Sequence, residues 1–509
     1  MEKIAIIDLG SNSIRFVVIE IKDNRSYSLL YQEKESIRLG HGLMQTGELS
    51  NAGMDRAMTC LAVYRHLISV MEIDTTIAVA TAAVRSAKNG EAFLQRVRTQ
   101  TGIEMKIISG EREAYLGYLG VINTIDIKDC ILFDFGGASV EFTLVRNGKQ
   151  EHSLSVPIGA VTLTEKFGLQ GTVSGEMLEK CLTCIRKKLS DIPWLAHARL
   201  PLVGVGGTAR AIAKMDQRTT NYELPTLHNY VVGKDNFDAI YALVTERTYV
   251  NRKKIPGLSS ERADLIVAGV AAISAIFTLT ESDRLIVSGC GLREGLFFEH
   301  YAGLYHLPSP YIENILSFSI ANVIGNLDPV NSKHVDQVEK VSLLLFDKLS
   351  FLHGYGPRER QLLATAAKLH DIGKIINYYS HARHSAFMIG HAPLYGLTQT
   401  EQLVASFIAG FHHGISRKIM RAYRYVHIPS EEEWRMIRKV STFLALAEAS
   451  DTTYEQIIKD ITVESADTVI VLVLETYPGS SHEAVNYEMQ QLKKQFKREF
   501  DTSLLFVWK

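Results

Sequence analysis

Apolar residues in the first third of the chain alternate between short β-branched runs and longer stretches with helical spacing. Ile4–Ile7 and Phe16–Ile21 are strand-like runs on either side of the polar turn Gly10–Ser13, a pattern that predicts a β-hairpin. Ala52–Met71 has the apolar spacing of a helix, and Thr76–Ala80 predicts another strand. Strands that alternate with helices predict an α/β domain.

Part of this pattern occurs a second time. IIDLGSNSIRFVVIE begins at Ile6 and LFDFGGASVEFTLVR begins at Leu132. Each copy consists of a strand-like run, a turn of the form Asp-x-Gly-x-x-Ser and a second strand-like run. The repeat predicts two related α/β domains that meet near residues 120–128 and face each other across a cleft.

The character of the chain changes near residue 305. HLPSPY at residues 306–311 carries two prolines and is typical of a linker. Ile312–Asp451 is nearly all helical, and the strand-like runs Ala466–Glu475 and Ser503–Trp508 flank an amphipathic basic helix over Ser481–Glu499. The pattern therefore predicts α/β domains at residues 1–124 and 125–305, a helical domain at 306–459 and a small α+β tail of β-α-β form at 460–509.

Composition narrows the class of protein. The chain has 509 residues, of which 46% are hydrophobic and 22% charged, which excludes a disordered, collagen-like or disulfide-scaffold protein. Its formal net charge of −1 supplies no global attraction to nucleic acid or to an anionic membrane, so any anion site must be local. The longest uncharged apolar run, Leu265–Thr280, is shorter than the ~20 residues that span a bilayer. It predicts a buried helix, and we expect neither a nucleic-acid partner nor stable membrane insertion.

The cysteines and the N-terminal residues indicate the cellular compartment in which the protein is expected. Five cysteines without a paired framework indicate a reducing environment, and Cys181 and Cys184 are expected as a reduced pair on one helix. The segment MEKIAIIDLG enters a strand-like run with no basic region ahead of it. We therefore expect a cytoplasmic protein.

Four glycine-rich loops follow strand-like runs. A single such loop is typical of a tight turn, but four at strand ends, two of them carrying Asp, favour phosphate binding with a divalent cation held by the carboxylates. None matches the Walker A pattern or a complete dinucleotide fingerprint, which excludes a P-loop NTPase and a Rossmann dehydrogenase. The loops span Asp8–Ser13, Asp134–Ser139, Val203–Ala209 and Val287–Gly295.

Two further residues have both a structural and a functional interpretation. Glu113 falls in the first turn of a helix predicted over Glu111–Leu119, where an acid can complement the helix dipole or activate water. Arg85 follows a strand and is either a bidentate phosphate clamp or a solvated surface residue. Local pattern alone leaves both alternatives open.

Together these stretches resemble the exopolyphosphatase/guanosine pentaphosphate phosphatase family, a branch of the actin-like ATPase superfamily. The resemblance covers the first 300 residues in family order and implies two actin-like (ribonuclease H-like) α/β domains flanking a cleft. It rests on DLGSNSIR, TAAVRSAKN, ISGEREAYLG, DFGGASVE, VPIGAVTLTEKF, VGVGGTARA and SGCGLREG.

The resemblance implies a role for each matching residue. Glu113 corresponds to the catalytic base, and Asp134 and Glu141 are further catalytic acids around the metal and the attacking water. Asp8, Asp134 and Glu141 are the expected ligands of a cleft Mg²⁺. The expected phosphate-binding residues are Ser11, Asn12, Ser13, Arg85, Gly136, Gly137, Ala138, Ser139, Gly206, Gly207 and Thr208.

This chain departs from the family pattern at two positions. Ala138 stands where the family usually has a third glycine, which predicts a tighter approach of phosphate. Arg112 lies within the SGxxEA motif, where a positive contact is an added feature without an assured role.

The implied activity is hydrolysis of the terminal phosphoanhydride of inorganic polyphosphate, with guanosine pentaphosphate as the alternative substrate of the same cleft. Two other classes stay open: a metal-dependent hydrolase acting in the helical domain, and a nucleotide sensor without catalysis. A kinase is disfavoured because the acid of SGEREA suits water activation better than transfer to a second substrate. Family resemblance also implies a homodimer formed through the helical domain.

Histidine is concentrated in the second half of the chain. Of the 17 His, six lie at or before His300 and eleven from His306 onward. The order His334, His370–Asp371, Asp451 resembles the HD phosphohydrolase family and implies a second divalent metal in an HD-like helical domain. The alternative is a degenerate domain without metal. Further histidines that could line the same pocket are His381, His384, His391, His412 and His413.

Clusters of basic residues form a separate hypothesis. Each cluster is typically a solvated face, although a long polyanion would favour a basic track leading from the cleft. The candidate residues are Arg417, Lys418, Arg421 and Arg424 after FHHG, and Lys493, Lys494, Lys497 and Arg498 in the tail helix.

Overall fold

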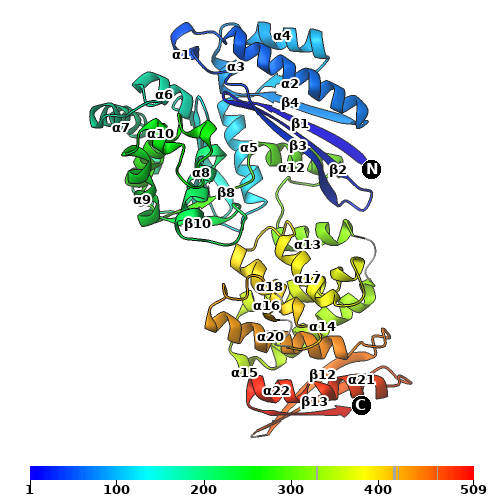
Figure 1. Cartoon of the computed structure of the whole chain (residues 1–509). Coiled ribbons are helices and arrows are strands. Elements are labelled where there is room, and N and C mark those ends of the chain that lie inside the picture. The colour runs from blue at the N-terminus through cyan, green and yellow to red at the C-terminus, as the bar shows by residue number, and fades with distance from the viewer. Residues whose placement is uncertain (328–330, 416–419, 422, 467) are drawn as a thin grey trace. The chain divides into compact units, whose positions relative to one another are not determined.

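The computed structural model describes residues 1–327, 331–415, 420–421, 423–466 and 468–509. The chain divides into two compact units, a first unit of Met1–Ile315 and a second unit of Leu316–Lys509 (Figure 1). The first unit contains two sheets, which define its first and second lobes. Within the described residues, no helix combines the length and apolar character needed to cross a membrane.

The first lobe is built on a five-stranded sheet with the order β3-β2-β1-β4-β5. The predicted hairpin is confirmed, because β1 and β2 pair antiparallel with Asp8 opposite Arg15. Strand β3 extends this meander, whereas β4 and β5 continue from β1 in parallel. The strands are β1 (Glu2–Leu9), β2 (Ser13–Ile21), β3 (Tyr27–Ser36), β4 (Thr75–Ala80) and β5 (Lys106–Ile107).

One face of this sheet is covered by helices. Ile7 and Phe16 are fully buried on that face against Leu61 and Tyr64 of α2, and the Phe16 and Tyr64 rings stack at 4.6 Å. Helix α2 coincides closely with the helix predicted over Ala52–Met71. The helices of this lobe are α1 (Leu43–Thr46), α2 (Asn51–Val70), α3 (Ala82–Ser86) and α4 (Gly90–Thr101). Helix α5 (Gly110–Ile122) follows β5 and packs against the second sheet.

The second lobe repeats the arrangement. Its sheet has the order β10-β11-β9-β6-β7-β8, in which β6, β7 and β8 form an antiparallel meander and β9 and β11 continue from β6 in parallel. The shared order confirms the prediction of two related α/β domains. The strands are β6 (Cys130–Phe135), β7 (Val140–Arg146), β8 (Lys149–Val156), β9 (Leu202–Val205), β10 (Tyr230–Gly233) and β11 (Arg284–Val287).

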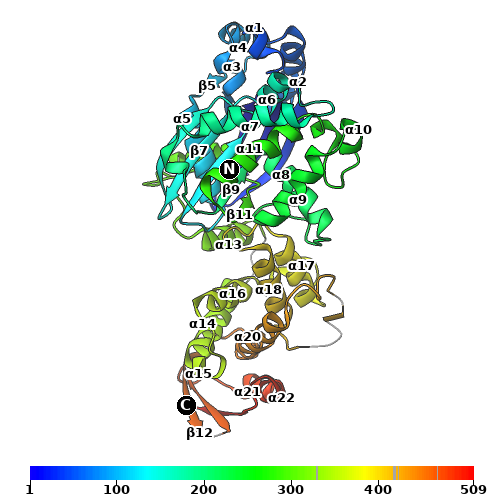
Figure 2. The same cartoon turned by 90° about the vertical axis from the view of Figure 1, so that its left-hand side faces the viewer.

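Alternation along β6 explains why this sheet has helices on both faces. Ile131 and Phe133 belong to a large core with α7 and α11, which lie over the sheet in Figure 2, while Cys130 and Leu132 pack with Tyr118 of α5 on the other face. Helix α11 is the buried helix predicted from the apolar run. The helices here are α6 (Ala160–Phe167), α7 (Gly175–Leu189), α8 (Gly206–Thr219), α9 (Lys234–Thr245), α10 (Tyr249–Arg252) and α11 (Ile266–Thr280).

Helix α12 (Leu292–Leu304) follows the last strand of the second sheet but packs against α5 and β1. Glycines permit this close contact: a Cβ on Gly120 would lie 2.1 Å from the Gly291 carbonyl oxygen, and one on Gly295 would lie 2.0 Å from that of Leu116. The residues of α12 thus belong structurally with the first lobe, although they fall in the segment 125–305 that the pattern assigns to the second.

The second unit is mainly helical at first, as predicted, and ends in a three-stranded sheet. Strands β13 and β14 are parallel and joined by helices, which is the predicted β-α-β unit. Two features differ: β12 adds an unpredicted antiparallel strand, and the single predicted basic helix is two helices that meet at Leu492. Strand β12 was missed because its sequence, IKDITVESA, mixes charges with β-branched residues and has no strict alternation.

The first helix of this unit is α13 (Ile315–Gly325), which starts at the boundary between the two units. The described elements continue with α14 (Ser332–Lys348), α15 (Ser350–His353), α16 (Pro357–Leu369), α17 (His381–His391), α18 (Gln399–Gly410), α20 (Glu431–Ala449), β12 (Ile458–Ala466), β13 (Val469–Thr476), α21 (Glu483–Gln491), α22 (Lys493–Phe500) and β14 (Ser503–Trp508).

Candidate active site

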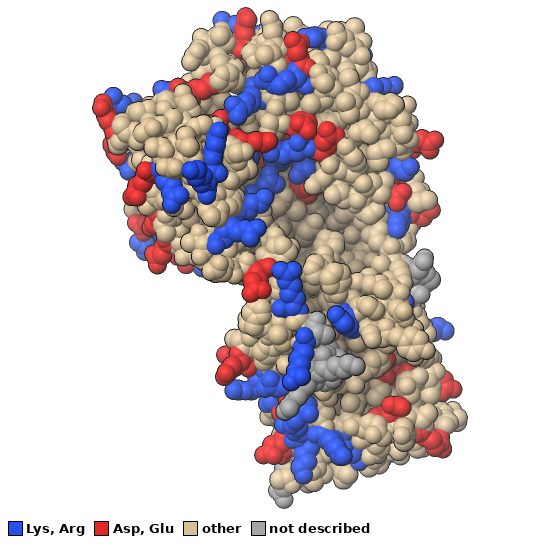
Figure 3. Space-filling view, viewed as in Figure 1, with Lys and Arg blue, Asp and Glu red and all other residues tan. Residues whose placement is uncertain are grey.

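The first unit contains a pocket between its two lobes. On the face shown in Figure 3, Lys and Arg side chains gather along the hollow between the lobes. Arg85 and Ala138 are the predicted cleft residues that do not line the pocket. The predicted residues that do line it are Asp8, Ser11, Asn12, Ser13, Glu113, Asp134, Gly136, Gly137, Ser139, Glu141, Gly206, Gly207 and Thr208.

The turns after β1 and β6 have the same construction. In the first, the Gly10 N–H donates to the Ser13 carbonyl at 3.1 Å, and in the second the Gly136 N–H donates to the Ser139 carbonyl at 2.9 Å. The turns face each other closely, because a Cβ on Gly137 would lie 3.0 Å from the Cβ of Ser11. Small residues in both turns leave their backbone amides open to an anion entering between them.

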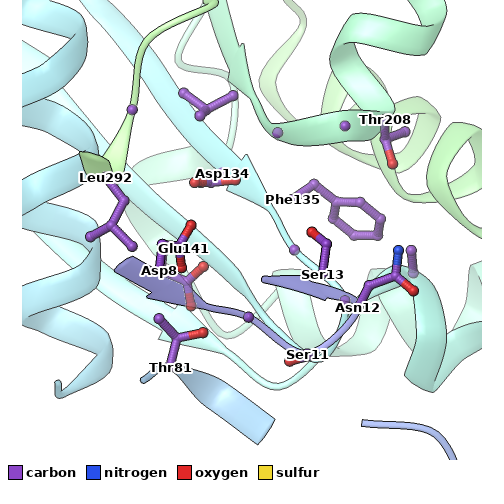
Figure 4. A pocket seen from close by; sticks show the side chains of 18 of the residues that line it. Asp8, Ser11, Asn12, Ser13, Thr81, Asp134, Phe135, Glu141, Thr208 and Leu292 are labelled. Atoms are coloured by element: carbon purple, nitrogen blue, oxygen red, sulfur yellow. The ribbon is translucent and has the colours of Figure 1, made fainter. Parts of the chain in front are cut away.

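Three carboxylates lie at the ends of these strands. Asp8 and Asp134 are the penultimate residues of β1 and β6, and Glu141 is the residue of β7 directly opposite Asp134. Figure 4 shows them gathered on one side of the pocket, with Asn12, Ser13 and Thr208 on the other. The hydroxyls of Ser139 and Ser155 donate to Glu141 Oε1 at 2.6 and 2.7 Å.

Glu113 reaches the same pocket from the first turn of α5. The helix begins at Gly110 because Ser109 caps it, its hydroxyl accepting the Arg112 N–H at 3.1 Å. Arg85 donates to Glu113 Oε2 at 3.1 Å and to the Ile108 carbonyl at 2.7 Å. In this structure Arg85 therefore holds the Glu113 carboxylate in place, rather than lining the pocket itself.

Burial raises the pKa of all four acids. It raises the pKa of Asp134 to about 6 and that of Glu141 to about 7, and it also raises that of Asp8. The pKa of Glu113 lies well above its ordinary value because of burial and the neighbouring Glu141, against the opposing effect of Arg85. A divalent cation would favour the ionised forms, so these residues fit a Mg²⁺ site with Asp8, Asp134 and Glu141 as its ligands.

Four arginines line the pocket that the sequence analysis had not assigned. Three of them lie within or directly after a glycine-rich loop, where the sequence analysis considered only the Gly, Ser and Thr residues. The fourth lies in a segment without a motif. Burial and the neighbouring arginines lower the pKa of Arg210 to about 9. A position next to a phosphate loop was the available signal for three of the four. The arginines are Arg15, Arg210, Arg262 and Arg293.

A second, more basic pocket adjoins the first and shares these four arginines. It adds Lys34 and Lys214, and its acidic residues are Glu33, Glu261 and Glu294. Gly207 leaves room for the Arg262 side chain as it lies here, since a Cβ at that position would lie 1.6 Å from a guanidinium nitrogen. The four arginines thus lie where the two pockets adjoin.

The second unit brings together all four residues of its predicted metal site. His334 Nδ1 lies 2.8 Å from Asp451, and the Nε2 atoms of His334 and His370 lie 3.7 and 3.6 Å from Asp371. Glu448 was missed, although its Oε2 lies 3.0 Å from both of these Nε2 atoms. Its spacing of three residues before Asp451, on the same helical face, was the available signal.

The other late histidines divide into two sets. His381, His412 and His413 form a second group able to hold a metal, whereas His384 and His391 belong to neither group found among the described residues. Two residues of the hypothetical basic track, Arg417 and Lys418, lie outside the residues that the structure describes.

The fold and pocket define a class before any relative is considered. Two lobes that share a strand order, with facing glycine-rich turns and a group of carboxylates between them, are features of the actin-like architecture. Comparison with family models agrees: residues 17–302 match the Ppx/GppA phosphatase family and residues 319–471 match its domain III. The chain belongs to the Ppx/GppA phosphatase family, and is thus a hydrolase of phosphoanhydride bonds.

Individual relatives support this assignment. A guanosine-5'-triphosphate,3'-diphosphate pyrophosphatase of Vibrio vulnificus is 28% identical over 417 residues, covering 80% of this chain and 79% of the relative. The crystal structure of an exopolyphosphatase from Cytophaga hutchinsonii is 25% identical with a TM-score of 0.56, covering 59% of this chain and 98% of that one. The Ppx/GppA family member of Aquifex aeolicus is 29% identical with a TM-score of 0.52, covering 60% and 99%.

Proposed function

We propose that the pocket of the first unit hydrolyses the terminal phosphoanhydride of inorganic polyphosphate and releases orthophosphate. The observation that carries this proposal is the position of Glu113, held by Arg85 beside three further carboxylates, opposite two facing glycine-rich turns. Mg²⁺ bound by Asp8, Asp134 and Glu141 would offset substrate charge.

Glu113 acts as the base in this proposal. It takes a proton from water as the water oxygen bonds to the terminal phosphorus, and the bond from that phosphorus to the bridging oxygen breaks. A raised pKa makes this carboxylate a stronger base for the transfer, and the contact with Arg85 orients it. Backbone amides and the four arginines stabilise charge on the phosphoryl oxygens.

The second pocket supports a polymeric substrate. It extends the cationic lining beyond the turns, so phosphates behind the terminal one meet further Lys and Arg side chains. Its described lining contains no aromatic ring on which a guanine base could stack. These features favour a phosphate chain over a nucleotide.

Guanosine pentaphosphate remains the second candidate because of the name of the Vibrio vulnificus relative, which matches most of this chain. The terminal phosphate of its 5′-triphosphate would occupy the same turns and be hydrolysed by the same residues. The two candidates differ only in what lies behind the reacting phosphate.

Phosphate release from polyphosphates of several lengths and from guanosine pentaphosphate tests both candidates. We expect Glu113→Gln to lower kcat by about 10²- to 10⁴-fold on every substrate while the fold is retained. Glu111→Gln, an exposed acid in the same helical turn, is the matched control and should retain activity. Near-normal turnover by Glu113→Gln would contradict the mechanism, and a higher kcat/KM on guanosine pentaphosphate would select the second candidate.

A further inference from the structure

Thr81 lines the pocket of the first unit but has no part in the reaction described so far. It is the first residue of the TAAVRSAKN motif and lies between β4 and α3. The residue is only 4% exposed. A hydroxyl that is so deeply enclosed normally has a hydrogen-bond partner, so its surroundings show what it can contact.

The backbone of Thr81 is held at both its N–H and its carbonyl. The N–H donates to the Leu9 carbonyl at 3.1 Å, which continues the parallel pairing of β4 with β1, and the carbonyl accepts the Arg85 N–H at 3.0 Å. Asp8 lies opposite Val79 in this register, and side chains two residues apart along a strand share a face. The Thr81 side chain is therefore on the same face of the sheet as Asp8.

The hydroxyl of Thr81 has no hydrogen-bond partner among the residues that the structure describes. Thr81 occupies the N-cap position of α3, where a threonine hydroxyl usually accepts a helix N–H, but no such bond is made. Figure 4 shows the side chain on the side of the pocket that carries Asp8 and Glu141. An enclosed hydroxyl without a partner is costly, so its partner is expected among the molecules that enter the pocket.

The proposed reaction requires a group of this kind. The attacking water has two hydrogens, of which Glu113 takes one as a proton. The other hydrogen needs an acceptor that leaves an oxygen lone pair directed at the phosphorus. Asp8, Asp134 and Glu141 are the expected ligands of Mg²⁺, so a neutral hydroxyl beside them suits this role.

The other hydroxyls of the described pocket lining are placed for different contacts. The Ser139 hydroxyl is already occupied, because it donates to a carboxylate at 2.6 Å. Ser11 and Ser13 belong to the first glycine-rich turn, and Thr208 lies in the first turn of α8. Figure 4 shows Ser13 and Thr208 on the side of the pocket opposite the carboxylates. These positions suit contacts to phosphate.

We propose that Thr81 is a further catalytic residue, whose hydroxyl accepts a hydrogen bond from the attacking water. Glu113 removes the other hydrogen as a proton while the water oxygen bonds to the terminal phosphorus and the bond from phosphorus to the bridging oxygen breaks. Thr81 neither gains nor loses a proton in this step, because its contribution is to orient the water. This role rests on the function proposed for the pocket and adds a residue to it.

Two substitutions of Thr81 in the full-length protein test the proposal. Thr81→Val keeps the shape of the side chain and removes the hydroxyl, so kcat for phosphate release from polyphosphate should fall by about 10- to 100-fold with KM unchanged. Thr81→Ser keeps the hydroxyl and should retain most of the wild-type kcat. Thermal unfolding of both variants should resemble that of wild type, because the hydroxyl has no partner among the described residues.

Thr143→Val is the matched control. Thr143 is fully buried on β7, its hydroxyl also lacks a partner among the described residues, and it does not line the pocket. The same exchange there should leave kcat at the wild-type value.

Polyphosphate affinity gives a readout that separates water from substrate as the partner of the hydroxyl. It is measured by calorimetry in the Glu113→Gln background, where turnover is slow. Adding Thr81→Val should leave this affinity unchanged, because the proposed contact is with water. Weaker binding by the double variant would place the hydroxyl on the phosphate chain and overturn the proposal.

A kcat near the wild-type value for Thr81→Val, or equal losses in Thr81→Val and Thr81→Ser, would also overturn it. Near-normal turnover by Glu113→Gln would instead refute the function proposed for the pocket. A defective Glu113→Gln beside a normal Thr81→Val would refute the role of Thr81 alone. If Thr81→Val does not fold, Thr81→Ala also removes the hydroxyl and supplies the same comparison with Thr81→Ser.

Discussion

Glu141 is a carboxylate that is 2% exposed and has two serine hydroxyls as its hydrogen-bond donors. Burial and the neighbouring Asp134 oppose its ionisation more strongly than the two hydroxyls favour it. Burial likewise opposes the ionisation of Asp8, Asp134 and Glu113 and raises their pKa. The residues expected to hold the cation are thus the ones whose ionisation destabilises the cation-free fold.

This conflict predicts a pH dependence of stability. The pKa of Glu141 rises from 4.5 to about 7 on folding, so the native state binds more protons and stability falls as pH rises between these values. The loss attributable to this residue is about 3 kcal/mol above pH 7. In the presence of a chelator, we therefore expect Glu141→Gln to unfold at a higher urea concentration than wild type at pH 8. Near pH 4 the two proteins should unfold at the same urea concentration.

The check is a pair of urea titrations across that pH window. Adding Mg²⁺ should recover the stability of wild type at pH 8 but not change the variant to the same extent. Parallel pH profiles for the two proteins would show that the Glu141 carboxyl is not the source of the loss.

At the scale of elements, the contact between α5 and α12 positions residues on both sides of the pocket. Helix α5 carries Glu113, and α12 carries Arg293 and follows the Gly289–Gly291 loop. The contact depends on two glycines. Gly120 of α5 lies against the backbone of Gly291, and Gly295 of α12 lies against the backbone of Leu116 in α5. Close backbone approach here brings together the helices that carry Glu113 and Arg293.

Two glycines of α5 provide a matched test. A Cβ on Gly120 would meet the Gly291 carbonyl oxygen at 2.1 Å, so Gly120→Ala should push the helices apart and lower the free energy of unfolding by about 1–3 kcal/mol. Gly117, on the same helix, has nothing within 4 Å of that position. Gly117→Ala should raise stability by about 0.5–1 kcal/mol through its helix propensity.

Thermal unfolding and phosphate release measure both effects. We expect Gly120→Ala to lose activity beyond its loss of stability, since it displaces α12 from the pocket. A Gly120→Ala variant as stable and active as Gly117→Ala would show that the contact is not tight in solution.

At the scale of the whole molecule, the chain divides into two compact units, Met1–Ile315 and Leu316–Lys509. The relatives from Cytophaga hutchinsonii and Aquifex aeolicus are matched over nearly their full length by about three-fifths of this chain. A protein of this family can therefore fold with the equivalent of the first unit alone. The pocket around Glu113 lies wholly within that unit.

This division predicts that residues 1–315 fold as an independent unit and retain phosphate release from short polyphosphate. The reason is that every residue of the proposed mechanism and its supporting cores lies within the fragment. A single cooperative melting transition and activity abolished by Glu113→Gln in the fragment are the expected results. An inactive fragment alongside an active full-length protein would show that the second unit completes the site.

Elements with a strong local signal were predictable. The β1–β2 hairpin follows from β-branched runs around a polar turn, and the apolar run of α11 from its length between two acids. Strand β12 and the break at Leu492 were not predictable, because their structure depends on the sheet and helices they pack against. The site residues in glycine loops were recognisable by motif, whereas Arg262, in a segment without one, was not.

The sequence alone determined the class of fold, the repeat and the family, because these reside in local periodicity and in short motifs whose order is readable along the chain. Only the tertiary structure decided that Arg85 holds Glu113, that α12 packs on the first lobe, and that Asp371 lies between two groups of histidines. Such relations join residues far apart in sequence. They depend on which side chains burial leaves without partners, and local pattern carries no information about that.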